Sequence, residues 1–230
     1  MKNAHTVFWL LLLSIGSEWA TAQRTSNQPI IVAFDATSKP IRFGMGEIEK
    51  ALKKTEQSVR EQSLYVNGLS ADISIRVLPK PGKPAIQEEG YRLENQSGRI
   101  LITATDATGA MYGAMDVAEQ LRMGKSLKKL IPKTTSPHLA VRALKVNLPW
   151  LPYRTGPAMD VHLDVCNDLA YWQRLLDMMA RNRFNVLSLW SVHPFSFMVK
   201  PTNFPMANNY SDQEMTERKQ FWTSLFRITK

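Results

Sequence analysis

The pattern of hydrophobic and polar residues in the N-terminal half predicts a small α/β sandwich. The apolar run at residues 30–34 predicts a strand, and residues 73–77 alternate between apolar and polar side chains, as a half-buried strand does. Met45, Ile48 and Leu52 lie on one face of a predicted helix, because they are spaced three and four residues apart.

Two further strands and a second helix complete this half. Residues 91–94 and 99–104 predict strands joined by a turn, whereas the proline-rich segment before them predicts a loop, since proline cannot donate to a sheet. Asp106 is placed to cap the helix that follows, and Gly109 and Gly113 let that helix pack closely on the sheet. The predicted order is β-α-β-β-β-α.

The C-terminal half shows the pattern of a parallel β-α-β unit. Apolar runs within residues 141–148 and 184–190 predict two strands, and a helical pattern over residues 169–179 predicts a helix between them, with Asn167 or Asp168 as its cap. A strand, a helix and a second strand in this order form a parallel crossover. Because parallel strands are covered on both faces, this half predicts part of a larger sheet.

The use of aromatic residues divides the chain into two regions. Residues 23–149 contain five aromatic residues and no tryptophan, whereas residues 150–230 contain thirteen aromatic residues. Residues 123–139 are rich in lysine and contain glycine and proline, which is typical of a surface linker. We therefore expect an N-terminal α/β domain over residues 23–122 and a second domain over residues 140–230.

Composition and the N-terminus indicate a folded, exported chain. Of the 230 residues, 44% are hydrophobic and 21% are charged, which excludes intrinsic disorder, a coiled coil and a multi-span membrane protein. Residues 1–22 have a positive start at Lys2, a short apolar stretch and the small-x-small ending Ala20-Thr21-Ala22 of a signal peptide. The alternative, a membrane anchor, needs a longer apolar run. We expect a periplasmic or extracellular protein with no membrane span after cleavage.

The charge balance bears on the partner. Lysine and arginine number 29 against 20 acidic residues, giving a net charge of +9. Export argues against nucleic acid, and the lysines lack the interleaved aromatic residues of single-strand binders. A solvated basic face is the simplest interpretation, and an acidic carbohydrate stays open as the partner.

The sequence offers no cofactor motif. Cys166 is the only cysteine, so an internal disulfide is excluded, and a half-buried thiol is favoured over a nucleophile. His162, Asp164 and Cys166 alternate and could line one strand face as metal ligands, but mixed ligands in a loop are a weak signal. Neither a His-Glu-x-x-His motif nor a phosphate-binding glycine loop is present. We expect no metal and no cofactor.

Motifs in both halves carry a family resemblance. In the N-terminal half they lie at residues 89–93, 100–104, 106–113 and 119–121, and they resemble the small α/β domain that precedes the catalytic barrel in β-hexosaminidases and α-glucuronidases, which are exported glycoside hydrolases. The C-terminal half resembles the first two barrel strands of related enzymes, over residues 141–147, 181–185 and 188–195. The resemblance implies the first two β/α units of an incomplete TIM (β/α)8 barrel.

Active sites of such barrels lie at the C-terminal ends of the strands. Asn147 ends the first predicted strand, and Trp190 and His193 end the second. Strand alternation puts Trp190 on the face opposite Leu189, where its ring could stack on a sugar. By resemblance, Arg142 matches an arginine that holds sugar hydroxyls in hexosaminidases, and His193 matches a histidine of the pocket. The expected substrate-binding residues are Arg142, Asn147, Trp190 and His193, the alternatives being structural roles.

Glycoside hydrolysis needs two carboxyl groups that flank the scissile bond. The acidic residues beyond Trp150 fall at predicted helix caps or within helices, and no candidate pair is visible. We therefore expect no catalytic residue here, and interpret the chain as the N-terminal portion of a secreted glycoside hydrolase that is inactive by itself. The alternative function is a non-catalytic carbohydrate-binding or interaction protein that retains the α/β domain.

Overall fold

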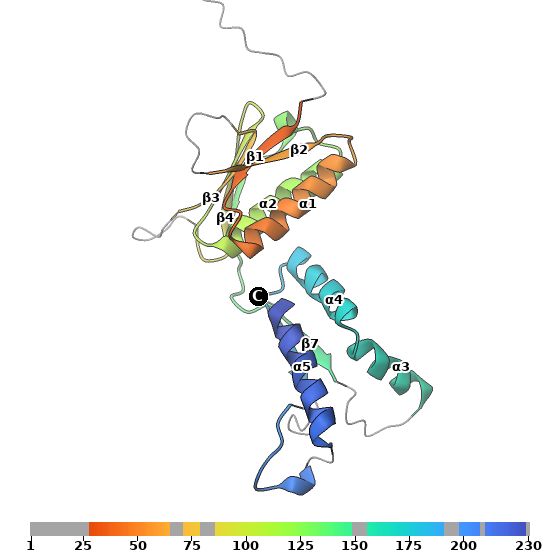
Figure 1. Cartoon of the computed structure of the whole chain (residues 1–230). Helices are drawn as coiled ribbons and strands as arrows, with labels where there is room; N and C mark the ends of the chain where they lie inside the picture. Colours follow the sequence, from red (N-terminus) through yellow and green to blue (C-terminus); the bar gives the residue numbers. More distant parts are fainter. Residues whose placement is uncertain are drawn as a thin grey trace, which may run out of the picture.

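A computed structural model of the chain describes residues 28–64, 71–78, 86–148, 156–190, 198–207 and 210–228. These residues form an α/β domain and a second, smaller part built around two parallel strands (Figure 1). The predicted signal peptide, residues 1–22, lies outside the described residues. None of the helices in the described ranges combines the length and the hydrophobicity needed to cross a membrane.

The first part is a six-stranded mixed sheet in the order β2-β1-β3-β5-β4-β6. Strand β1 pairs in parallel with β2 and β3, β3 pairs in parallel with β5, and β4 is antiparallel to both β5 and β6. The bounds are β1 Ile30–Phe34, β2 Val59–Ser63, β3 Ile73–Val77, β4 Tyr91–Gln96, β5 Arg99–Ala104 and β6 Lys133–Thr135.

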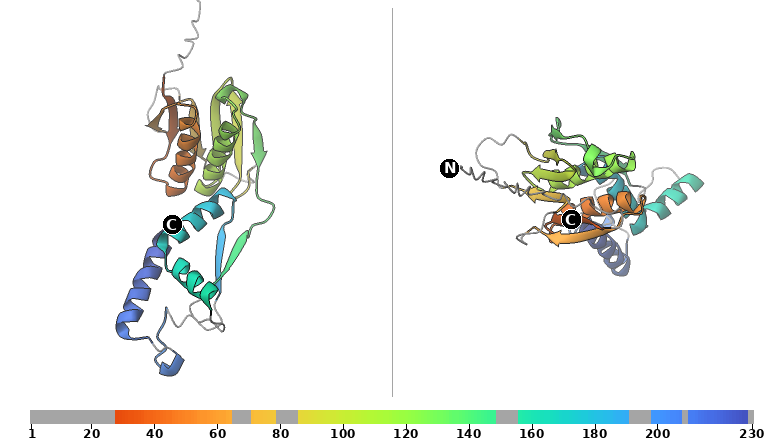
Figure 2. Two further views of the ribbon diagram at one scale, coloured as in Figure 1. Left: turned by 90° about the vertical axis from the view of Figure 1, so that its right-hand side faces the viewer. Right: turned by 90° about the horizontal axis from the view of Figure 1, so that it is seen from above.

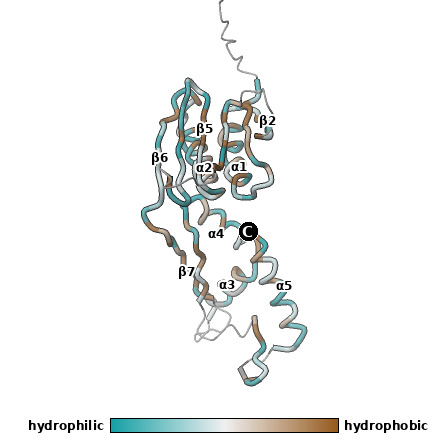
Figure 3. Tube along the Cα trace, turned by 90° about the vertical axis from the view of Figure 1, so that its left-hand side faces the viewer, coloured by the Kyte–Doolittle hydropathy of each residue, from teal (hydrophilic) through white to brown (hydrophobic). Residues whose placement is uncertain are grey.

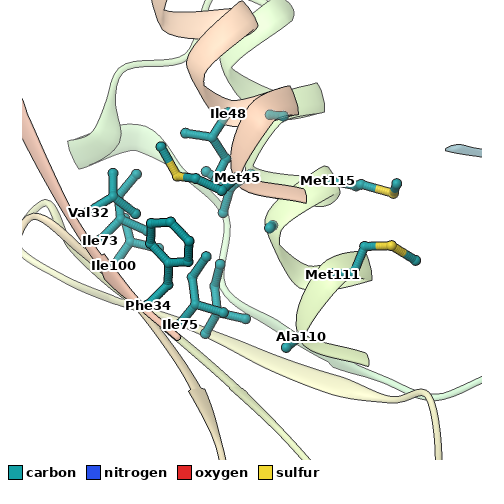
Figure 4. Close-up of a cluster of buried hydrophobic side chains, with 14 of the residues drawn as sticks. Val32, Phe34, Met45, Ile48, Ile73, Ile75, Ile100, Ala110, Met111 and Met115 are labelled. Carbon is teal, nitrogen blue, oxygen red and sulfur yellow. The ribbon is translucent and has the colours of Figure 1, made fainter. Parts of the chain in front are cut away.

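Two helices, α1 (Lys39–Lys53) and α2 (Ala107–Arg122), pack side by side on one face of this sheet (Figures 1 and 4). Phe34, Met45 and Ile75 are at most 1% exposed and lie between α1 and the strands. Asp106 caps α2 as predicted, because its side chain accepts a hydrogen bond from the backbone of Gly109 at 2.7 Å. Burial of this apolar layer is the main source of the domain's stability.

The sequence pattern misses two strands of the sheet. Strand β2 is mostly exposed and polar, so it has no apolar alternation that would mark it. Strand β6 has three residues, lies within the segment predicted as a linker, and pairs with β4. The same segment contains a short 3-10 helix, η1 (Leu127–Lys129), which the side-chain amide of Asn95 contacts through the carbonyl oxygen of Leu127. Part of the predicted linker is therefore ordered structure of the α/β domain.

The second part contains the predicted parallel crossover. Strands β7 (Ala143–Asn147) and β8 (Val186–Trp190) pair in parallel, and helices cover one of their faces (Figure 2). From β6 the chain continues through an extended segment into β7 (Figure 3). The helices are α3 (Pro157–Cys166), α4 (Leu169–Arg181) and α5 (Asp212–Ile228), with a 3-10 turn, η2 (Pro205–Ala207), before α5.

The cap of α4 lies at one of the two residues predicted for it, whereas helix α3 was not predicted. Asp168, not Asn167, caps α4 by accepting from the backbone of Ala170 at 2.8 Å, and Ser211 and Glu214 form a capping box before α5. The alternation of His162, Asp164 and Cys166 predicts that they line one strand face within a loop. These residues instead lie in α3, which begins at Pro157, a residue suited to a first helical turn.

Candidate functional site

The two faces of the β7–β8 pair differ in character. Leu187 and Leu189 are partly buried and pack on the cluster around Trp172 and Trp222, which belong to α4 and α5. The alternate residues of both strands are exposed and point to the other face, on which the described residues place no helix (Figure 2): Ala143, Lys145, Asn147, Val186, Ser188 and Trp190. The predicted alternation of the strands is confirmed.

The strand register brings two of the predicted site residues together. Asn147 pairs with Trp190 at the C-terminal ends of the strands, and the backbone N–H of Leu148 donates to the carbonyl oxygen of Trp190 at 2.7 Å. Trp190 as a whole residue is 43% exposed. An exposed aromatic face beside an amide that both donates and accepts hydrogen bonds suits a sugar ring and its hydroxyl groups.

Lys145 joins this pair. Its Nζ atom lies 4.8 Å from the centroid of the Trp190 ring, a cation–π arrangement, and its backbone pairs with that of Ser188. The sequence analysis did not single out Lys145, although strand alternation places it on the same face as Asn147. A positive charge here favours a ligand that carries a carboxylate.

Arg142 lies at the other end of β7. Its guanidinium group donates to the carboxylate of Glu89, to the hydroxyl of Tyr112 at 3.4 Å and to the carbonyl oxygens of Leu139 and Arg183. Its pKa is raised: burial lowers it, but the hydrogen bonds to Glu89 and Tyr112 outweigh that effect. The structure therefore separates Arg142 from Asn147 by the length of the strand.

The last of the predicted sugar ligands, His193, lies outside the described residues. So do Phe195 and Phe197, which follow it in the sequence. Phe204 lies just before η2 and is 71% exposed. Among the described residues, the site thus consists of Lys145, Asn147 and Trp190.

A cavity of about 600 Å³ lies between the α/β domain and the helices of the second part. Its walls include Phe43 of α1, Tyr112 of α2 and Ala180 of α4, together with Glu89 and Leu187. Because Leu187 points to the helix-covered face of β8, this cavity is separate from the site at Asn147 and Trp190.

Cys166 lies in surroundings that disfavour a reactive thiolate. The thiol is fully buried, and burial raises its pKa to about 11, which disfavours the reactive thiolate. Within the described ranges, no cluster of three or more His, Cys, Asp or Glu side chains is arranged to hold a metal ion. Helix α3 contains His162 and Asp164, so they do not alternate along a strand.

Comparisons with known proteins identify the fold. No protein-family model and no curated protein sequence matches the chain. Among solved structures, it is similar to a GH138 enzyme targeting pectin rhamnogalacturonan II, with a TM-score of 0.67 and 21% identity over 86% of this chain and 23% of that one. It is also similar to a GH115 4-O-methyl-α-glucuronidase with specificity for decorated arabinogalactans, with a TM-score of 0.50 and 14% identity over 84% and 28% of the two chains.

These likenesses confirm the fold class predicted from the sequence. The chain has the α/β domain and the first β/α units found in glycoside hydrolases that contain a TIM barrel. It spans about a quarter of the length of the two similar enzymes. At these identities the similarity describes the fold and does not extend to the activity.

Proposed function

We propose that this chain is the N-terminal portion of an exported glycoside hydrolase, in which the C-terminal ends of β7 and β8 contribute to the substrate site. The observation that carries the proposal is the exposed group of Lys145, Asn147 and Trp190 at those strand ends. The likeness in fold to two glycoside hydrolases supports it. Residues 23–122 and 140–230 are then the α/β domain and the barrel start expected from the sequence, and residues 123–139 connect them while adding η1 and β6 to the α/β domain.

The substrate class that we propose is an acidic carbohydrate. The net charge of +9 and the ammonium of Lys145 beside the Trp190 ring both favour a ligand with a carboxylate. The two similar enzymes are described as acting on rhamnogalacturonan II and as an α-glucuronidase, and this supports a uronic acid as the sugar. Arg142 and His193 remain predicted sugar ligands, although the contacts of Arg142 favour another role.

The mechanism assigned to these residues is binding and orientation. The indole face of Trp190 would stack on the apolar face of a pyranose, the Asn147 amide would pair with hydroxyl groups, and Lys145 would pair with the carboxylate. We assign no catalytic carboxyl pair to this chain, since the acidic residues of the described second part lie at helix caps or on helices.

A binding titration tests this proposal. NMR of the full chain with a uronic-acid oligosaccharide is expected to shift the Trp190 indole and Asn147 amide signals, with Kd on the order of 1 mM for such an open site. Lys145→Gln is expected to weaken acidic-sugar binding about threefold to tenfold and to leave a neutral oligosaccharide unaffected. Lys129→Gln, which removes an exposed lysine of η1, is the matched control.

Three results would contradict the proposal. NMR shifts that cluster on the α/β domain instead of β7 and β8 would show that the sugar binds elsewhere. If Trp190→Ala binds the oligosaccharide as tightly as Trp190→Phe does, the ring of residue 190 does not stack on the sugar. Hydrolysis of an aryl glycoside by the purified chain would show that catalytic groups are present here.

A further inference from the structure

One carboxylate of the α/β domain contacts the beginnings of both strands of the second part. Glu89 Oε2 accepts a hydrogen bond from Arg142, which directly precedes β7. Glu89 Oε1 accepts from the side-chain amide of Asn185, which directly precedes β8, at 3.1 Å. The side chains of Glu89 and Arg142 are only 19% and 16% exposed, so solvent screens this ion pair weakly.

The backbone of Glu89 is itself held in place by α2. Glu89 has a φ of 57°, a left-handed conformation that is uncommon for residues other than glycine. Its N–H donates to Asp106 Oδ2 at 2.7 Å, and the other carboxylate oxygen of Asp106 caps α2 at Gly109. The Glu89 carboxylate is therefore presented from a fixed point of the α/β domain.

The same side chains fix the two strands relative to each other. The backbone N–H of Arg142 donates to Asn185 Oδ1 at 2.9 Å, and the backbone N–H of Asn185 donates to the carbonyl oxygen of Arg142 at 3.0 Å. The ladder then runs residue by residue without a bulge and ends with Asn147 opposite Trp190. In a ladder of this kind, the pairing at one end determines the pairing at the other.

We propose that Glu89 is a positioning residue that locks the starts of β7 and β8 to the α/β domain, by accepting hydrogen bonds from Arg142 and Asn185. Through the ladder, this lock sets the register in which Asn147 faces Trp190. The significance of that pair for sugar binding rests on the proposed function, but the lock itself is a property of the fold. The guanidinium of Arg142 is then engaged by protein groups at the strand start.

Hydrogen exchange and NMR of the full chain test the lock without any sugar. Glu89→Ala is expected to lower the protection of amides in β7 and β8 at least tenfold and to weaken the cross-strand NOE between Asn147 and Trp190. Amides of β5 serve as the internal reference and keep their protection. Glu88→Ala, at the exposed neighbouring residue, is the matched control and is expected to change neither readout.

A side-chain swap separates direct contact from general damage. Asn185→Asp places a second carboxylate against Glu89 and is expected to lower protection in β7 and β8 by repulsion. The double variant Glu89→Gln with Asn185→Asp restores a donor and an acceptor at that contact and is expected to recover most of the protection.

Two results overturn the proposal: unchanged protection and NOE in Glu89→Ala, or a double variant no better than Asn185→Asp alone. If Glu89→Ala also lowers protection in β5, the single variant has damaged the whole fold. The double variant then decides: protection no better than in Asn185→Asp alone overturns the proposal. An intact register in a chain that binds no sugar contradicts the proposed function and leaves the lock standing.

Discussion

At the scale of single residues, the two glycines Gly109 and Gly46 occupy opposite surroundings. A Cβ atom on Gly109 would overlap the backbone carbonyl oxygen of Gly90, because the first turn of α2 rests directly on the turn that presents Glu89. Within the described part of the chain, nothing beyond the adjoining residues and backbone of α1 itself lies within 4 Å of the corresponding position on Gly46, in the middle of α1. A backbone carbonyl in a turn cannot move aside as a flexible side chain can. The identical substitution therefore has opposite consequences at the two sites.

Replacing each glycine by alanine tests this difference. Gly109→Ala is expected to lower the free energy of unfolding by about 2 kcal/mol, because α2 must move away from the Glu89–Gly90 turn. Gly46→Ala is expected to raise it by about 0.5 to 1 kcal/mol, since alanine stabilises a helix interior relative to glycine. Urea unfolding followed by circular dichroism gives both values. A free energy of unfolding that is unchanged or raised in Gly109→Ala would mean that α2 does not approach the turn as closely as described.

At the scale of elements, a buried carboxylate connects three helices. Glu47 of α1 is 5% exposed at its side chain and accepts from Lys50 of the same helix at 3.0 Å, from Arg122 of α2 at 3.2 Å and from Arg181 of α4 at 3.1 Å. Burial alone raises the pKa of Glu47, but the hydrogen bonds from Arg181 and Lys50 outweigh this effect and hold the pKa below its usual value. Glu47 therefore ties the α/β domain to α4 in its ionised form.

The pH dependence of stability follows from that lowered pKa. The contribution of Glu47 is fully present above the unfolded-state pKa of 4.5 and is lost as the pH falls through the lower pKa of the folded state. Glu47→Gln is expected to cost about 2 kcal/mol at pH 7 and less at pH 3, because the wild-type carboxyl group loses its charge as the pH falls through its lowered pKa. Glu61→Gln, in an exposed pair with Arg42, is the control and is expected to change stability by less than about 0.5 kcal/mol. An equal cost of Glu47→Gln at both pH values would contradict the ionised bridge.

The same scale shows what sequence patterns can reveal. Strands β1, β3, β7 and β8 have an apolar run or alternation, so they could be predicted, whereas β2 is polar and β6 too short to carry a period. Strand parity brought Asn147 and Trp190 to one face of the sheet. The contact of Arg142 with Glu89 joins residues 53 positions apart, and no local pattern encodes such a pairing. Long-range contacts between charged residues are for this reason what sequence patterns leave undetermined, whereas Lys145 of the candidate site could have been found from strand alternation.

At the scale of the whole molecule, the two parts differ in how completely they are built. The α/β domain has a six-stranded sheet with a continuous apolar core, whereas the second sheet consists, within the described residues, of β7 and β8 alone. A two-stranded sheet is marginal in water unless other elements support it. Here that support comes from α4 and α5 and from the ion pairs of Glu47 and Glu89. We therefore expect the second part to unfold before the first.

Tryptophan fluorescence separates the two events, because residues 23–149 contain no tryptophan, while Trp172, Trp190 and Trp222 all lie in the second part. Helices of both parts contribute to circular dichroism at helix wavelengths, so two phases are expected there in urea for the chain without residues 1–22. The fluorescence transition is expected to coincide with the first phase and to precede the second, which reports α1 and α2, by about 0.5 to 1 M if the stabilities differ by roughly 1 to 2 kcal/mol. Both Glu89→Ala and Glu47→Gln are expected to widen the gap, since each removes a tie between the parts. Coincident transitions in all three proteins would mean that the α/β domain and the β7–β8 unit fold as one cooperative body.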